Sequence, residues 1–309
     1  MKRIKNLTLG ILGATVLSLG LFACSNDDAE TTNATTEQKV IAARESVNSD
    51  IKPEYFEFMG KFHNDGLDYI YDNSVKYNYN LQYDDLKLSS LEYFDYKYEY
   101  AEKSATLYFT EEMDYNIKNM VKNNLTLNQV VDELPVTDIE KVYLYELEDI
   151  VMDNIDYKKK IDDIDRLNVR IQNNPDLDDV QLARLFMTNS VAKHSIQYWN
   201  SEKREKWEKT FPIEIDPNYD GAQYQTKGLT QGQWNEVIRD DIKGFIGAFG
   251  VGVRTGAIRG AIVIGLASGG TGALAGAIIG ALGGGVATGA AGAALASGAS
   301  YAAITLWPY

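Results

Sequence analysis

Residues 244–260 read GFIGAFGVGVRTGAIRG, and residues 272–298 read GALAGAIIGALGGGVATGAAGAALASG. These two stretches hold most of the 26 glycines of the chain, and Ala, Ile, Val and Leu fill the positions between them. Flexible linkers instead place Ser, Gln or Lys between their glycines. The glycine-rich tail is therefore predicted to be buried, and the rest of the chain to be organised around it.

Within the tail, glycines recur every four residues in two runs. The first run is Gly252, Gly256 and Gly260, and the second is Gly272, Gly276, Gly280 and Gly284. On an α-helix this spacing leaves a smooth stripe along one face, and a second helix can approach it closely. We predict that these glycines are helix-packing positions in a hairpin at 230–309, able to contact a partner helix or a second copy of the chain.

The tail has two open interpretations, a membrane element or a tightly packed hairpin. Residues 260–309 contain no charged residue, which gives enough length for two short passes through a bilayer. The terminal Trp307 and Tyr309 are typical of membrane interfaces. On the other side, Gly and Ala supply little hydrophobic driving force, and Arg254 would face lipid in the first arm. The sequence of the tail is therefore compatible with both interpretations.

The N-terminus has the layout of an export signal, because Lys2, Arg3 and Lys5 precede an apolar run that ends at Phe22. Cys24, the only cysteine, follows directly after Leu-Phe-Ala. Because Leu21-Phe22-Ala23-Cys24 resembles the lipobox of bacterial lipoproteins, we expect residues 1–23 to be a signal peptide and Cys24 to be the lipidated residue; an ordinary signal with a chance cysteine is the alternative. The polar residues 24–40 are expected to form a flexible tether.

The charge of the chain is strongly acidic and unevenly distributed. The formal net charge is −14, and no Asp or Glu follows Asp241. Nucleic-acid binding depends on Lys and Arg, so the acidic body argues against a nucleic-acid partner. A single cysteine also excludes internal disulfides and cysteine metal sites.

Residues 41–210 show helical periodicity. Apolar residues recur every three or four positions after Pro53, again within 139–151 and 161–171, and from Asp178 to Trp199. Capping boxes begin at Thr137 and at Thr230, and the second one starts a helix that runs directly into the tail. The predicted fold is mainly α: an acidic helical bundle at 41–210, a loop at 211–229, and the Gly/Ala-rich hairpin at 230–309.

A tyrosine-rich segment near 86–108 is ambiguous. Phe94, Tyr96, Tyr98 and Tyr100 alternate with charged residues, which is the period of a strand, although the segment also fits a solvated helix. Tyrosine rings supply both apolar area and a hydrogen-bonding hydroxyl. A minor β segment is therefore one structural hypothesis and a helix the other. For function, the tyrosines form either a patch that binds sugars or peptides or the margin of a core.

Catalytic and metal-binding signals are weak. The two histidines are His63 and His194; Ser195 is adjacent to His194, so on a helix the two side chains point about 100° apart. We find no matched nucleophile, base and orienting group and predict no enzymatic activity.

A calcium loop is only half present. Asp216, Asn218 and Asp220 match its first half, but Lys227 stands where a bidentate glutamate belongs. We therefore expect a Pro/Gly turn and no metal or cofactor.

Two resemblances indicate a location. Leu21-Phe22-Ala23-Cys24 resembles the lipobox of bacterial lipoproteins, and the tail resembles the glycine zippers of outer-membrane lipoproteins and, more loosely, glycine-zipper bacteriocins. The first implies an exported protein anchored through acylated Cys24, with membrane lipid as partner, at the outer membrane or cell surface. The second implies either a packing element or a membrane-active, pore-forming effector. A surface binding module that uses the tyrosines is a further alternative.

Overall fold

Helices account for most of the residues that the computed structural model describes, which are 51–97, 109–134, 136–212, 229–253 and 273–305. This part of the chain is 83% helical and contains no strand, which confirms the mainly α class. It belongs to one compact unit, Ser46–Tyr309.

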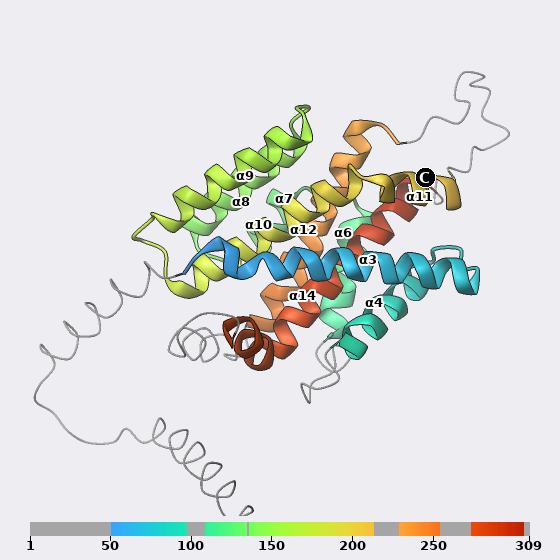
Figure 1. Cartoon of the computed structure of the whole chain (residues 1–309), viewed down its shortest axis with the longest axis horizontal. Helices are drawn as coiled ribbons and strands as arrows, with labels where there is room; N and C mark the ends of the chain where they lie inside the picture. The colour runs from blue at the N-terminus through green and yellow to red at the C-terminus, as the bar shows by residue number, and fades with distance from the viewer. Residues whose placement is uncertain (1–50, 98–108, 135, 213–228, 254–272, 306–309) are drawn as a thin grey trace, which may run out of the picture. The chain divides into compact units, whose positions relative to one another are not determined.

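The elements follow one another with short connections where these are described (Figure 1). They are η1 (Pro53–Phe56), α3 (Glu57–Tyr77), α4 (Tyr83–Lys97), α6 (Glu111–Lys122), α7 (Leu127–Glu133), α8 (Asp138–Met152), α9 (Tyr157–Gln172), α10 (Asp179–Trp199), α11 (Glu202–Thr210), α12 (Gln231–Val253) and α14 (Ala273–Thr305).

Reciprocal caps define where several helices begin. At the start of α8 the Thr137 backbone N–H donates to the Glu140 carboxylate at 2.9 Å, and the Thr137 hydroxyl accepts from the Glu140 N–H. Thr230 and Gln233 make the same pair of bonds at the start of α12. Each box satisfies two backbone donors that the first helical turn leaves without partners. Both predicted helix starts are confirmed.

The tyrosine-rich segment is helical as far as it is described. Residues 83–97 form α4, so the β hypothesis is wrong for 86–97, and residues 98–108 lie outside the described part. Phe94 is fully buried, whereas Tyr96 is 75% exposed. Positions two apart point in nearly opposite directions on a helix but in the same direction on a strand. Phe94 and Tyr96 therefore lie on the buried and the solvated face of α4, so within the described part the aromatic residues of the alternation do not share one face.

The turn between α3 and α4 uses two residues with positive φ. Asn78 ends α3 in the left-handed region at φ 53°, and Leu81 has φ 50°. Asn adopts this conformation readily, but leucine does so at a cost. Leu81 is completely buried, so its apolar contacts offset that cost.

The two arms of the tail, α12 and α14, lie at the centre of the bundle. α12 packs on α6, α7, α8 and α10, while α14 packs on α3, α4 and α6, and the two arms pack on each other (Figure 1). Side chains are described up to Ala248 in α12 and from Gly289 in α14. Every α14 residue from Gly289 to Thr305 except Ile304 is buried. The described parts of the predicted hairpin and body therefore form one unit and share one core.

An aromatic cluster closes this core near the C-terminal end of α14. The rings of Trp199 and Tyr301 are stacked with centroids 6.1 Å apart, and Trp234 lies 4.8 Å from Trp199. Trp207 completes the cluster against Tyr301 at 5.3 Å. Large aromatic rings contribute much of a core's buried area, so this cluster fixes α14 against α10, α11 and α12. None of the helices in the described part is long and apolar enough to cross a membrane.

Candidate functional site: the buried helical hairpin and its anchors

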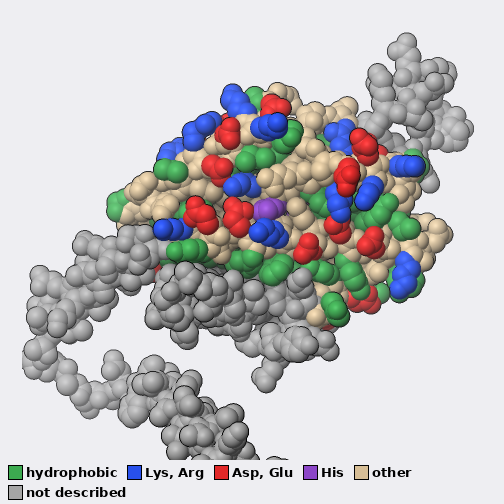
Figure 2. Space-filling view, in the orientation of Figure 1, with side chains coloured by type: hydrophobic (Ala, Val, Ile, Leu, Met, Phe, Trp, Pro, Cys, Tyr) green, Lys and Arg blue, Asp and Glu red, His purple; other side chains and the backbone are tan. Residues whose placement is uncertain are grey.

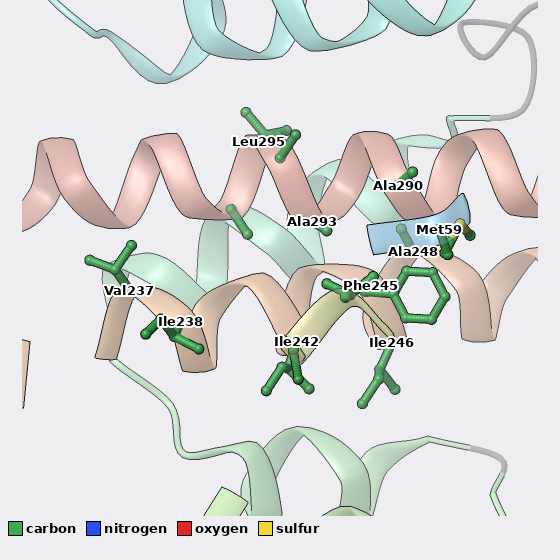
Figure 3. Packing of buried hydrophobic residues seen from close by; sticks show 14 of the residues in the cluster. Met59, Val237, Ile238, Ile242, Phe245, Ile246, Ala248, Ala290, Ala293 and Leu295 are labelled. Carbon is green, nitrogen blue, oxygen red and sulfur yellow. The ribbon is translucent and has the colours of Figure 1, made fainter. Parts of the chain in front are cut away.

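The two arms approach each other closely at a crossing of Gly244 and Gly292. A Cβ atom on Gly244 would lie 2.4 Å from the Gly292 carbonyl oxygen and 2.5 Å from the Ala296 Cβ. A Cβ on Gly292 would lie 2.6 Å from the Ala248 Cβ. Such distances are far below van der Waals contact, so only glycine permits this approach. Figure 3 shows the surrounding side chains, with Ile242 and Phe245 on α12 and Ala293 and Leu295 on α14.

A pattern with glycine at every fourth position does not contain this crossing. The pairs that meet are Gly244 with Ala248 and Gly292 with Ala296, each a small residue four positions from another. Treating alanine as equivalent to glycine would have included both pairs, although it would not have shown that they face each other.

The predicted zipper glycines fall elsewhere in the tail. Gly252 lies in α12, and Gly276, Gly280 and Gly284 lie in α14, as predicted helical positions, but their surroundings are outside the described side chains. Gly256, Gly260 and Gly272 lie outside the described residues altogether. Their packing role stays a prediction.

The α12 arm carries a run of buried charges. Arg239, Asp240, Asp241 and Lys243 are all at most 6% exposed. The Lys243 ammonium forms an ion pair with Asp240 and donates to the Leu125 carbonyl at 2.5 Å. Arg239 Nη2 donates to Asn124 Oδ1 at 2.7 Å. The two cations thereby tie α12 to the loop between α6 and α7, and burial lowers the pKa of Lys243.

A second anchor joins the start of α12 to α8 and α9. Lys160 is 1% exposed; its ammonium donates to the Val151 carbonyl at 2.6 Å and to Asn235 Oδ1 at 2.8 Å. The Asn235 amide in turn donates to the Met152 carbonyl at 3.4 Å. These bonds satisfy carbonyls at the end of α8 that have no partner within the helix. Burial lowers the pKa of Lys160 to about 8.

The third anchor joins α12 to α3 and α10. Asp241 Oδ2 accepts a hydrogen bond from the Ser195 hydroxyl and lies 3.4 Å from His63 Nε2. All three side chains are fully buried. In a Ser-His-Asp hydrolase the histidine lies between the serine and the aspartate, and the serine is accessible to substrate. Here the aspartate lies between the other two, so the arrangement joins helices and does not activate a nucleophile.

The side chains of α14 from Gly289 to Thr305 make few polar contacts to other helices by comparison. The Ser90 hydroxyl donates to the Ala291 carbonyl at 2.9 Å, and Trp199 Nε1 donates to the Ser297 hydroxyl at 3.2 Å. Tyr301 donates to the Phe211 carbonyl at 2.9 Å. These neutral bonds leave the described α14 held mainly by apolar packing.

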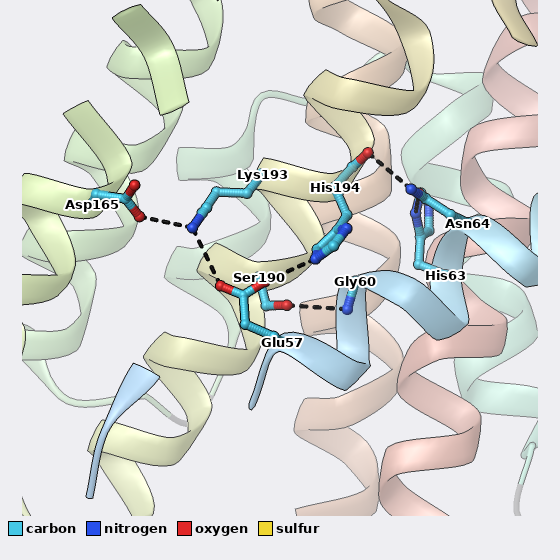
Figure 4. A network of polar contacts seen from close by, with 8 residues as sticks. All are labelled: Glu57, Gly60, His63, Asn64, Asp165, Ser190, Lys193 and His194. Carbon is cyan, nitrogen blue, oxygen red and sulfur yellow. Dashed lines mark hydrogen bonds and ion pairs between the residues drawn. The ribbon is translucent and has the colours of Figure 1, made fainter. Parts of the chain in front are cut away.

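His194 points away from Ser195, as the helix geometry predicted. Its Nε2 lies 2.8 Å from Glu57 Oε2, and Lys193 bridges Glu57 and Asp165 at 3.2 and 2.7 Å (Figure 4). The hydrogen bond from His194, aided by Lys193, lowers the pKa of Glu57 to about 2. This partly exposed network ties α3 to α10 and α9. Acidic and basic side chains are interspersed over the face seen in Figure 2.

The described tyrosines between Tyr77 and Tyr96 divide between the margin of the core and the surface. Tyr83 and Tyr93 are buried, and they donate to Asp114 at 3.0 Å and to Asp65 at 3.3 Å. Burial and these carboxylates raise the pKa of both hydroxyls. Tyr77 and Tyr96 remain exposed. A binding role for this region stays a prediction, since its most regular part lies outside the described residues.

Cys24 and the calcium-loop residues Asp216, Asn218 and Asp220 also lie outside the described residues. Within the described part, no group of His, Cys, Asp or Glu is placed to hold a metal ion. Four carboxylates, those of Glu146, Asp149, Asp153 and Asp163, line an open hollow between α8 and α9. No family model matches the chain, and neither a curated protein nor a solved structure shows significant similarity to it.

Proposed function

We propose that the chain is a lipid-anchored, non-enzymatic protein of the cell envelope, attached through acylated Cys24 at the outer membrane or cell surface. In this proposal the glycine-rich hairpin is a packing element of the protein's own bundle. Membrane lipid is the first partner of the protein. A second copy of the chain, contacting the glycine stripes predicted between Gly252 and Gly284, is the second partner.

The observation that carries this proposal is the burial of α14 from Gly289 to Thr305 inside the helical body. Its smallest positions, Gly292 and Ala296, meet α12 and not an outside partner. A segment used in this way does not have to attach the protein to a bilayer. Attachment is then left to the lipid on Cys24, where several acyl chains give stable anchoring.

The polar groups singled out in the sequence also support a non-enzymatic role. Ser195 and His63 are fully buried beside Asp241, and His194 is engaged with Glu57. A catalytic nucleophile and its base must reach a substrate, so this arrangement favours a structural role.

The experiment that tests anchoring is metabolic labelling with radioactive palmitate. The wild type and a Ser25→Ala control, which keeps the thiol, are expected to incorporate label and to stay with the membrane after a carbonate wash. Cys24→Ala is expected to do neither. Equal labelling of the cysteine variant would overturn the anchoring proposal, and retention of that variant after the wash would show that the tail itself holds the membrane.

A second candidate is a membrane-active effector whose hairpin leaves the bundle and inserts into a target bilayer. The observation in its favour is the unequal attachment of the two arms: α14 is apolar and held by a few neutral hydrogen bonds, whereas charged contacts tie α12 to its neighbours. Release of such a hairpin would require those charged contacts to break.

Dye leakage from anionic and zwitterionic liposomes discriminates between the two functions. The effector predicts leakage by the delipidated mature chain, and more leakage by Lys243→Met, which loosens α12. Arg166→Ala, at an exposed ion pair with Asp163, is the matched control and should behave like wild type. Absence of leakage from both the wild type and Lys243→Met would remove the effector.

A further inference from the structure

Three fully buried polar side chains meet where α3, α10 and α12 come together: His63, Ser195 and Asp241. Asp241 Oδ2 is shared, since it accepts the Ser195 hydroxyl and lies 3.4 Å from His63 Nε2. Neither His63 Nε2 nor Asp241 Oδ1 has a hydrogen-bond partner in the described part of the chain. Buried polar groups rarely lack a hydrogen-bond partner, so the positions of the protons decide whether the atoms of this cluster are satisfied.

The position of one proton follows from Asn64. Its amide nitrogen donates to the His194 carbonyl at 3.1 Å, which fixes the orientation of the amide group. The Asn64 oxygen therefore faces His63 Nδ1, at 2.9 Å, as an acceptor (Figure 4). Nδ1 must then carry a hydrogen, because two acceptors cannot share a hydrogen bond.

The other side of the ring then has a deficit. A neutral His63 with its hydrogen on Nδ1 presents a lone pair at Nε2, and an ionised Asp241 presents a second acceptor. The Ser195 hydroxyl has only one proton and already directs it to Asp241. The pair becomes complementary only when it holds one further proton, either on Nε2 as an ion pair or on the carboxyl group as a neutral pair.

Other charges near this cluster are already paired. On α12, Asp240 is bound to Lys243, and Arg239 is bound to Asn124. On α3 and α10, Glu57 is bound to His194 and Lys193.

A further titratable group nearby is the Tyr198 hydroxyl, which donates to Asp68 at 3.1 Å. Burial, first, and then Asp68 raise the pKa of Tyr198. α14 has no charged residue from Ala273 to Thr305. Within the described part, these neighbouring groups do not donate to the pair, so the further proton must be bound to His63 or to Asp241.

We propose that one proton shared between His63 and Asp241 latches α12, the inner arm of the hairpin, to α3 and α10, and that the packing of the hairpin responds to pH through it. This inference concerns the folded bundle alone and holds whether or not Cys24 is acylated.

The direction of the pH dependence follows from counting protons. An exposed histidine releases its proton near pH 6.5 and an exposed aspartate near pH 3.9. Above about pH 6.5 the unfolded chain holds one proton fewer than the latched pair, so stability falls as pH rises. Below about pH 3.9 the unfolded chain holds one more, so stability falls as pH falls. The latch is strongest between these two limits.

The test uses the full mature chain carrying His194→Asn, which leaves His63 as the only histidine. From pH 6.5 to 7.5, below the lowered pKa of Lys160, its equilibrium constant for unfolding in urea should rise by roughly four- to fivefold per pH unit. Adding Asp241→Asn should flatten this rise, because the amide brings two protons of its own, one for His63 Nε2 and one for the Ser195 oxygen. Adding Ser195→Ala is the matched control and should keep the rise.

A rise that persists with Asp241→Asn, or that is absent from the His194→Asn chain, would overturn the latch. A second measurement avoids the buried substitution in case that variant does not fold. On unfolding in unbuffered urea at pH 7.0, where Lys160 with its pKa of about 8 is still almost fully protonated, the His194→Asn chain should release roughly two-thirds of a proton. Release of none would contradict the proposal equally.

Discussion

The two arms of the hairpin are both buried, but different forces hold them. α12 places four charged side chains in the interior. Asp240 is paired with Lys243 of the same helix, and the other three contact the α6–α7 loop, α10 and α3. α14 brings no charge and fits through its small residues, with Gly292 and Ala296 against Gly244. The comparison teaches that equal burial can come from matched charges on one side of a hairpin and from close backbone approach on the other.

The difference has an energetic consequence. Buried ion pairs contribute little net stability compared with apolar packing, but removing one partner leaves an uncompensated charge. A glycine contact reacts instead to added volume, because the interior is already densely packed. The α12 arm should therefore be sensitive to loss of charge, and the α14 arm to added methyl groups.

The largest effect is expected from Lys243→Met, which leaves Asp240 without its ammonium partner and the Leu125 carbonyl without its donor. We expect a loss of about 3 kcal/mol in the free energy of unfolding, measured by urea denaturation. Lys243→Met combined with Asp240→Asn should recover part of the loss because it removes the buried anion. A double variant no more stable than the single one would show that charge is not what anchors α12.

Gly292→Ala should have the next largest effect. Its new methyl carbon would lie 2.6 Å from Ala248 Cβ and 2.7 Å from the Gly244 oxygen, so the helices must move apart at a cost of about 2 kcal/mol. Gly298→Ala is the matched control on the same helix, since its methyl group would meet Leu86 at 3.6 Å. There we expect a gain of about 0.5–1 kcal/mol from helix propensity. Thermal denaturation of both variants checks this. If both substitutions change the melting temperature equally, the close helix approach does not limit the size of the residue at position 292.

Tyr301→Phe removes the hydrogen bond to the Phe211 carbonyl but keeps the stacked ring. The expected loss is about 1 kcal/mol, because a buried acceptor loses its donor. Tyr96→Phe, at an exposed position, should leave the urea midpoint unchanged. If Tyr301→Phe is equally silent, polar contacts contribute nothing measurable to holding α14.

The smallest effect concerns Glu57, outside the hairpin. Its folded pKa of about 2 lies below the usual value, so its stabilising contribution is present above about pH 4.5 and is lost as pH falls toward 2. Because the side chain is about one-third exposed, solvent screening keeps the effect below about 1 kcal/mol. Glu57→Gln should therefore differ from wild type at pH 6 and approach it at pH 3.5. A difference that stays constant between these pH values would contradict the lowered pKa.

Local sequence patterns predicted the helices well. The capping boxes at Thr137 and Thr230 mark the starts of α8 and α12, and the periodicity from Asp178 to Trp199 marks α10. These signals depend on residues three or four apart, so a single helix is enough to express them. The tyrosine alternation misled because polar and apolar residues alternate over too few positions to separate a strand from a helix.

The site was less predictable because its members come from distant parts of the chain. Gly244 meets Gly292 across the hairpin, and Asp241 meets His63 and Ser195 from two other helices. His63 is hydrogen-bonded to the adjacent Asn64, but nothing in its local sequence identifies Asp241 as its neighbour. Pairing of this kind depends on how whole helices pack.

The central claim is that the glycine-rich arm α14 is part of the folded core and not a free membrane segment. Amide hydrogen exchange on the delipidated mature chain, in the absence of membranes, tests it most directly. We expect amides from Gly289 to Thr305 to be protected as strongly as those of α10, because both unfold only with the whole bundle. Rapid exchange of this stretch in a chain whose α10 remains protected would contradict the account.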